Sequence, residues 1–201
     1  MLQLFGHARS INVRKVLWLL DELALPFTHD PAPSPDALRA LNPNALVPVL
    51  RDGDFVLCES NTICRYLATR AGRVDLLPAE PAARARVEQW MDWQATELNN
   101  AWRYAFMAKV RLSPAYTEPA AIAASLAEWN QHMRLLDAQL ARGGPYLLGE
   151  TLSLADIVLG LSTQRWYASP IERVELPAVA AYYAHLGTRE GFRRHGCNGL
   201  P

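Results

Sequence analysis

The sequence predicts a small α/β unit followed by an all-helical part. Glycine and proline interrupt the chain repeatedly up to Gly72, whereas no glycine occurs between Gly72 and Gly143. Glycine destabilises a helix interior by about 1 kcal/mol, so this long stretch without it favours long helices. We therefore expect a sheet covered by helices in residues 1–78 and a helical bundle in residues 84–201, joined by a linker.

The first part reads as strand, helix, strand, hairpin and helix. Short apolar or alternating runs predict the strands, and apolar residues at three- and four-residue spacing predict the helices. Asp52-Gly53 predicts the hairpin turn, because Asp-Gly accepts the positive φ angles of a type I′ turn. The expected strands are 2–4, 27–29, 47–51 and 55–58, and the expected helices begin near residues 13 and 60.

In the second part, helix boundaries follow from local chemistry. One apolar stripe predicts a helix from Arg84 to about Leu112, and a second predicts one from Pro119 to Leu140. Ser153 and Asp156 have the spacing of a capping box, with Leu152 and Ile157 placed as a hydrophobic staple. Pro177 is placed to open a later helix.

Composition excludes several classes of function. Twenty basic residues balance twenty acidic ones, and each part is balanced separately, so we expect no nucleic-acid partner and no anionic membrane surface. The three cysteines, Cys58, Cys64 and Cys197, are too few and too irregular for a disulfide framework or a zinc site, and we expect no metal. With neither a signal-peptide core nor an apolar run of roughly 20 residues, a cytoplasmic location is the default expectation.

Three places in the first part carry groups suited to chemistry. Ser10 ends the turn before the first helix, where free amides and the helix dipole stabilise anions. Val47-Pro48 would turn the backbone of Val47 outward for an extended ligand if the bond were cis. Glu59-Ser60 begins a helix and combines a hydroxyl with a carboxylate, which suits an amino-acid-like group. Taken singly, each has a plainer explanation as a helix cap or an edge-strand proline.

Together these segments resemble the cytosolic glutathione S-transferase family over nearly the whole chain. The strongest matches are Asn42-Pro43-Asn44-Ala45-Leu46-Val47-Pro48-Val49-Leu50, Glu59-Ser60-Asn61-Thr62-Ile63-Cys64-Arg65-Tyr66-Leu67 and Ser153-Leu154-Ala155-Asp156. The turn from Arg9 to Val16, together with Trp90-Met91-Asp92-Trp93, most resembles a bacterial branch similar to the enterobacterial GstB-type enzymes.

The resemblance implies a thioredoxin-like N-terminal domain that binds glutathione and an all-α C-terminal bundle that forms the pocket for an electrophile. Val47, ahead of a cis Pro48, would pair with the cysteinyl backbone of glutathione. Glu59 and Ser60 would hold its γ-glutamyl end. Ser10 matches the position that faces the sulfur in the serine and cysteine classes, and it would act there as a donor to the thiolate.

The implied chemistry has a consistent magnitude. Lowering a thiol pKa by two units from about 8.5 takes about 2.7 kcal/mol of preferential anion stabilisation. A hydrogen bond to a charged sulfur contributes roughly 1.5–3 kcal/mol, and a helix N-terminus adds to it. Asn12 is the alternative donor. We expect His7, Arg9 and Arg14 to be solvated rather than bound to a ligand carboxylate.

Two features depart from the family's pattern. The stretch between His29 and Asp36 is short and rich in proline, and Ala45 and Leu46 replace a common Gly-Lys pair. The partner of the glycine carboxylate of glutathione is therefore unassigned. The electrophile pocket is expected to include Trp102, Phe106 and Trp166, with Tyr104 and Met107 as further candidates, although each is as well suited to the bundle core.

These features favour an enzyme that conjugates glutathione to small electrophiles, or dehalogenates them. The alternative is a catalytically inactive binding or regulatory protein of the same family. A thiol-disulfide oxidoreductase is disfavoured, because position 10 is not cysteine and no Cys-x-x-Cys occurs. The resemblance also implies a homodimer and a role in detoxification.

Overall fold

The computed structural model describes all 201 residues, and its first part contains a four-stranded mixed sheet. The strands are β1 (Leu2–Phe5), β2 (Phe27–Asp30), β3 (Val49–Asp52) and β4 (Phe55–Cys58), in the order β2-β1-β3-β4. β1 runs parallel to β2 and antiparallel to β3, and β3 forms the predicted hairpin with β4. The predicted strands are all present, although β3 starts two residues later than expected.

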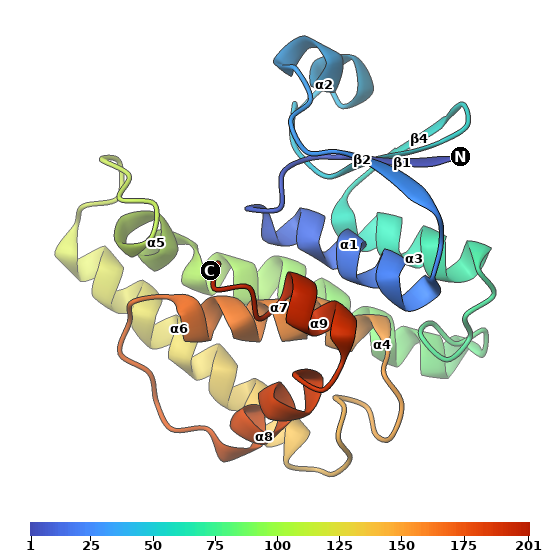
Figure 1. Ribbon diagram of the computed structural model, residues 1–201. Helices are drawn as coiled ribbons and strands as arrows, with labels where there is room; N and C mark the ends of the chain where they lie inside the picture. The colour runs from blue at the N-terminus through green and yellow to red at the C-terminus, as the bar shows by residue number, and fades with distance from the viewer.

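Helices cover both faces of this sheet. These helices are α1 (Ile11–Leu23), α2 (Pro35–Leu41) and α3 (Ser60–Arg70). α1 and α3 lie between the sheet and the helical part, and α2 lies on the other side (Figure 1). The sequence predicted no helix at α2, yet its N-terminus carries a usable signal: the Ser34 hydroxyl accepts a hydrogen bond from the amide of Ala37, and Pro35 takes the first helical position.

The helical part begins at Pro81. Its elements are α4 (Pro81–Trp93), the π-helical turn η1 (Gln94–Leu98), α5 (Asn99–Lys109), α6 (Pro119–Leu140), α7 (Leu154–Ala168), α8 (Pro177–Leu186) and α9 (Glu190–His195). The predicted helix from Arg84 to Leu112 thus starts earlier and is interrupted by a π turn, and α9 was not predicted. None of these helices combines the length and the apolar character needed to cross a bilayer.

The predicted capping box at the start of α7 is present and buried. Asp156 accepts hydrogen bonds from the amide and the hydroxyl of Ser153, both at 2.8 Å. It also accepts one from the amide of Leu147 at 2.8 Å, so this carboxylate ties a loop to the helix start. The linker before α4 is also bonded to the start of α7, because the carbonyl of Leu76 accepts a hydrogen bond from the amide of Leu154.

α1 is the helix that the two parts share. Nine of its residues are buried, and it packs against α3 on one side and against α7 and α9 on the other. Trp18 of α1 is fully buried where this helix meets α7 and α9. A Cβ at Gly160 of α7 would lie 3.2 Å from the Trp18 ring, and one at Gly191 of α9 would lie 2.5 Å from it. Glycine at both positions therefore lets the two helices close over the tryptophan.

An ion pair also joins α1 to the segment before α9. Arg189 donates from Nε to Glu22 at 2.9 Å, and the Trp18 indole donates to the same carboxylate at 2.8 Å. Burial by itself would raise the pKa of Glu22. The hydrogen bonds from Arg189 and Trp18 outweigh that effect and lower the pKa below its usual value.

We expect Gly160→Ala to destabilise the fold by up to about 2 kcal/mol. Alanine gains about 1 kcal/mol of helix propensity. Its Cβ, however, would lie 2.6 Å from Leu186 and 3.2 Å from the Trp18 ring, and overpacking of this kind costs typically 1–3 kcal/mol. Urea denaturation measures the difference. In a double-mutant cycle with Trp18→Phe the cost should shrink, and independent, additive effects would contradict this packing.

We expect Glu22→Gln to destabilise the fold by about 1–3 kcal/mol at neutral pH, because the hydrogen bonds to a charged group are lost. The lowered pKa fixes the sign of the pH dependence. The contribution of Glu22 is complete above its unfolded pKa, near 4.5, and is lost as the pH falls through the folded value. Denaturation curves of the two proteins should therefore converge in acid. A difference in stability that stays constant below pH 4 would contradict the assignment.

Candidate functional site

Three segments meet at one end of the sheet because of its register. Phe5, the last residue of β1, pairs with Val49, the first of β3, and Val49 pairs with Cys58, the last of β4. The turn after β1, the residues before β3 and the residues after β4 must therefore leave the sheet together. These are the segments that hold Ser10, Val47-Pro48 and Glu59-Ser60, so five of the predicted site residues share one edge.

Gly6 brings the first two segments into contact. Its φ is +132°, and a Cβ there would lie 2.7 Å from Val47 and 2.8 Å from Val13. A side chain at this position would push the segment before β3 away from α1. The absence of one lets Val47 lie directly against the turn that leads to Ser10.

Ser10 takes the cap position of α1, but its hydroxyl makes no hydrogen bond within the chain. The plainer explanation, a side-chain cap, is therefore wrong. Its carbonyl accepts from the amide of Arg14, and the earlier amides of the helix have no intrahelical acceptor. Ser10 and Asn12 are both half-buried, and neither side chain is engaged in an internal hydrogen bond. The start of α1 thus presents unused donors.

Val47 precedes a cis peptide bond to Pro48, as the resemblance implied. Val47 is outside the strands, and neither its N–H nor its C=O forms a backbone hydrogen bond in the loops and turns. Next to it, Leu46 is 63 % exposed. The side-chain amide of Asn42 donates to the carbonyl of Leu46 at 2.8 Å, so that amide is used by the loop itself.

Glu59 has a φ of +67°, an uncommon conformation for a residue with a side chain. Its carboxylate is exposed and forms no ion pair or hydrogen bond. Ser60, the first residue of α3, is 7 % exposed, and the first amide bonded inside the helix is that of Ile63. A hydroxyl, free amides and an adjacent carboxylate are therefore collected at the start of α3.

A buried lysine fixes the starts of the two helices relative to each other. Lys15 of α1 donates to the side chains of Asn61 at 3.2 Å and Gln94 at 2.9 Å. Asn61 in turn donates to the carbonyl of Met91 at 2.9 Å. Burial lowers the pKa of Lys15 to about 8. The π turn at Gln94 thus places an acceptor against α1, which explains why the long helix is interrupted there.

Cysteine does not replace Ser10 as a reactive group here. Cys64 is fully buried, and burial raises the pKa of its thiol to about 12. Burial also raises the pKa of Cys58, and the nearby Glu59 carboxylate adds to that shift. Thiols held in the neutral form are poor nucleophiles.

The structure brings together two of the three aromatic residues predicted for the pocket. Trp102 and Phe106 of α5 form an edge-to-face pair with centroids 5.2 Å apart. Trp166 of α7 donates instead to Asn130 of α6 at 3.2 Å and borders a separate hollow of about 530 Å³. Tyr104 packs against Tyr116. Of the residues predicted for the pocket, Trp102 and Phe106 are therefore the two that lie together and can form one wall of it.

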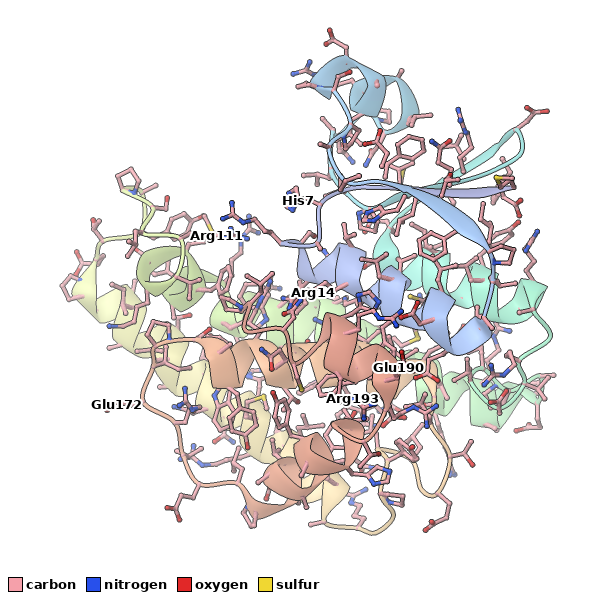
Figure 2. All side chains as sticks on the ribbon, viewed as in Figure 1. His7, Arg14, Arg111, Glu172, Glu190 and Arg193 are labelled. Atoms are coloured by element: carbon pink, nitrogen blue, oxygen red, sulfur yellow. The ribbon has the colours of Figure 1, made fainter.

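The expectation that Arg14 is solvated is wrong. Arg14 is fully buried in α1 and donates to Asn198 Oδ1 at 3.0 Å and to the carbonyls of Leu200 and Pro201 at 3.1 and 3.0 Å. Burial lowers its pKa to about 10. His7 and Arg9 are exposed, as predicted. Figure 2 shows Arg14 beside the last residues of the chain, with His7 at the edge of the sheet.

Sequence reasoning missed Arg165, which lies in α7 with a 4 % exposed side chain. Its guanidinium carbon lies 4.4 Å from the Trp102 ring centroid and 4.2 Å from that of Phe106. A signal existed in the sequence, because residues 154–166 contain only two charged residues, Asp156 of the capping box and Arg165. A helix that is apolar on all faces buries the few charges it carries.

Comparison with known proteins agrees with this geometry. Residues 4–77 match the glutathione S-transferase N-terminal domain, and residues 119–185 match the glutathione S-transferase C-terminal domain. The chain is 39 % identical to the glutathione S-transferase GstB of Escherichia coli, over 96 % of this chain and 97 % of that protein. It is 34 % identical to glutathione S-transferase 3 of Zea mays, over 96 % of this chain and 92 % of that protein.

A solved structure covers the whole chain. The theta-class glutathione S-transferase of Xanthomonas axonopodis pv. citri, determined with glutathione bound, superposes with a TM-score of 0.90 at 38 % identity and covers 100 % of this chain and 99 % of that one. The order of strands, the helical second part and the matches along both parts agree with one another. This chain belongs to the glutathione S-transferase family.

Proposed function

We propose that this protein is an active glutathione transferase in which the Ser10 hydroxyl stabilises the glutathione thiolate. The observation that carries the proposal is the unengaged Ser10 hydroxyl at the start of α1. It lies at the sheet edge where the free backbone of Val47 and the start of α3 also converge. A scaffold without catalysis has no need for an uncapped serine at this position.

Glutathione is a peptide-like anion, and each group at the sheet edge suits one part of it. The free N–H and C=O of Val47, ahead of cis Pro48, would pair with the cysteinyl backbone. The hydroxyl of Ser60 and the first amides of α3 would hold the γ-glutamyl carboxylate. The exposed carboxylate of Glu59 would hold the ammonium group.

The chemical step would be a nucleophilic substitution by sulfur. The thiol proton leaves to solvent, and the Ser10 hydroxyl and the start of α1 stabilise the thiolate that remains. The sulfur then forms a bond to an electrophilic carbon, while the leaving group, for example a halide, departs with the electron pair of the bond that breaks. Trp102 and Phe106 would form the apolar wall against which the electrophile packs.

The remaining assignments follow the family. We propose residues 1–78 as the glutathione-binding domain and residues 84–201 as the domain that shapes the pocket. The three cysteines are free thiols, which fits the cytoplasm, where glutathione keeps thiols reduced.

We also propose that the protein is a homodimer that acts in detoxification. Light scattering of the purified protein tests the oligomeric state. A monomer at micromolar concentration would contradict the proposed dimer.

The alternative is a binding or regulatory protein that keeps the fold without the activity. It predicts that glutathione binds weakly or not at all, and that no electrophile is consumed. Calorimetry with glutathione and turnover of a chlorodinitrobenzene separate the two functions. Absence of binding at millimolar glutathione would contradict the proposed transferase.

We expect Ser10→Ala to lower kcat/KM by about 10- to 100-fold, because a hydrogen bond to a charged group is worth roughly 1.5–3 kcal/mol. The thiol pKa of bound glutathione, followed by the ultraviolet absorbance of the thiolate, should rise by about one to two units. The affinity for glutathione should change little, since the backbone contacts stay.

Asn12→Ala is the matched control, because Asn12 is the other unengaged donor in the first turn of α1. It should leave the thiol pKa near the wild-type value. If Asn12→Ala raises this pKa and Ser10→Ala does not, the sulfur contact belongs to Asn12.

A further inference from the structure

Arg165 is buried without an acidic partner. Its side chain is 4 % exposed, its guanidinium donates no hydrogen bond within the chain, and its Nε is enclosed with nothing to bond to. A buried charge left unpaired is costly, and proteins normally compensate it with an opposite charge or a full set of hydrogen bonds. The two terminal nitrogens are not enclosed in this way, so an acceptor from outside the chain can reach them.

The aromatic rings hold Arg165 in place but do not satisfy it. The guanidinium stacks on Trp102 and Phe106, with distances of 4.4 and 4.2 Å from its carbon to the two ring centroids. Stacking of this kind stabilises the charge through the ring faces. It leaves the N–H groups, which lie in the plane of the guanidinium, without acceptors. Arg165 therefore lies against the wall of the proposed electrophile pocket with its donors unused.

The surrounding charges make the need for an anion greater. Burial, together with the positive charges of Arg14 and Arg111, lowers the pKa of Arg165 to about 9. Arg111, exposed after the end of α5, lies with its guanidinium carbon 5.5 Å from the Phe106 centroid and forms no ion pair. Lys15 is a further buried cation on this side of α1. The single buried carboxylate, Asp156, is committed to its capping box.

The arginine side chains near this site differ in whether their N–H groups have acceptors within the chain. Arg14 is satisfied by Asn198 and by backbone carbonyls of the last residues. Arg165 and Arg111 have no such acceptors. Figure 2 shows Arg111 beyond the end of α5 and Arg14 on α1.

We propose that Arg165 and Arg111 form an anion subsite of the electrophile pocket, so that the protein acts on electrophiles that carry a carboxylate. The planar guanidinium of Arg165 can donate two parallel hydrogen bonds to such a group. The inference rests on the proposed function, because it assigns the substrate class of the same site. The position proposed for the γ-glutamyl carboxylate of glutathione, at the start of α3, is separate from this subsite.

A pair of substrates that differ only in charge tests the subsite. One is the chlorodinitrobenzoate whose carboxylate lies para to the chlorine, and the other is its neutral carboxamide. In both, the glutathione sulfur bonds to the ring carbon and chloride leaves with the bonding electrons. Comparing them separates recognition of the carboxylate from formation of the thiolate, which both reactions need equally.

We expect Arg165→Met to raise KM for the benzoate by about tenfold or more, because hydrogen bonds to a charge are lost, and to change KM for the carboxamide less than twofold. Arg111→Gln should raise KM for the benzoate a few-fold. Arg134→Gln removes an exposed arginine of α6 whose side chain hydrogen-bonds to Gln131, and it should change neither value. An equal loss on both substrates would overturn the proposal, because the arginines would then act on the thiolate or on packing.

Two further measurements keep the test independent of folding and of turnover. The melting temperature of Arg165→Met should equal or exceed that of the wild type, since the arginine has no hydrogen-bond acceptor to lose and methionine keeps an apolar contact with the two rings. Calorimetry with unreactive dinitrobenzoate should show binding to the wild type and at least tenfold weaker binding to Arg165→Met, even if no substrate is turned over. If the protein binds dinitrobenzoate but turns over no substrate, the result would contradict the transferase and still support the subsite. If the wild-type protein does not bind dinitrobenzoate, the result would overturn the subsite.

Discussion

The burial of α1 on all sides is the constraint on which the rest of this structure depends. The helix lies between α3 and the sheet on one side and α7 and α9 on the other, and its residues belong to one hydrophobic core of 38 buried side chains that spans both parts. Trp18 is accommodated only because Gly160 and Gly191 lack side chains. Docking of the two parts is therefore fixed by a rigid helix, and the start of that helix is held at one edge of the sheet.

A helix buried on every face must also bury the charges that its sequence contains. Arg14 and Lys15 occupy consecutive positions, so they point in different directions and need different partners. Lys15 reaches Asn61 and the π turn at Gln94, which couples the start of α3 to the helical part. Arg14 reaches the last residues of the chain and holds them against α1. Burying these two charges is unfavourable, but the hydrogen bonds that compensate them fix the start of α3, the π turn and the last residues of the chain relative to α1.

What could be predicted from the sequence is what local chemistry decides. The Asp52-Gly53 hairpin and the capping box of Ser153 and Asp156 depend on a few neighbouring residues, and both are present as expected. Arg14 was expected in solvent because its local pattern does not show that α7 and α9 cover α1. Trp166 was placed in the pocket for the same reason, since its local sequence does not show the hydrogen bond that its indole donates to Asn130 of α6. Tertiary contacts between distant segments decided each of these cases.

The distribution of buried charge connects the fold to its chemistry. Three cations, Arg14, Lys15 and Arg165, are buried around the first turns of α1, and the one buried carboxylate, Asp156, is occupied elsewhere. Neutral acceptors can hydrogen-bond to a cation, but they do not cancel its charge. The interior is therefore short of negative charge beside the proposed sulfur position. A thiolate at Ser10 and a carboxylate at Arg165 would both supply negative charge. The positive potential of the buried cations therefore favours both the ionised form of glutathione and an anionic electrophile.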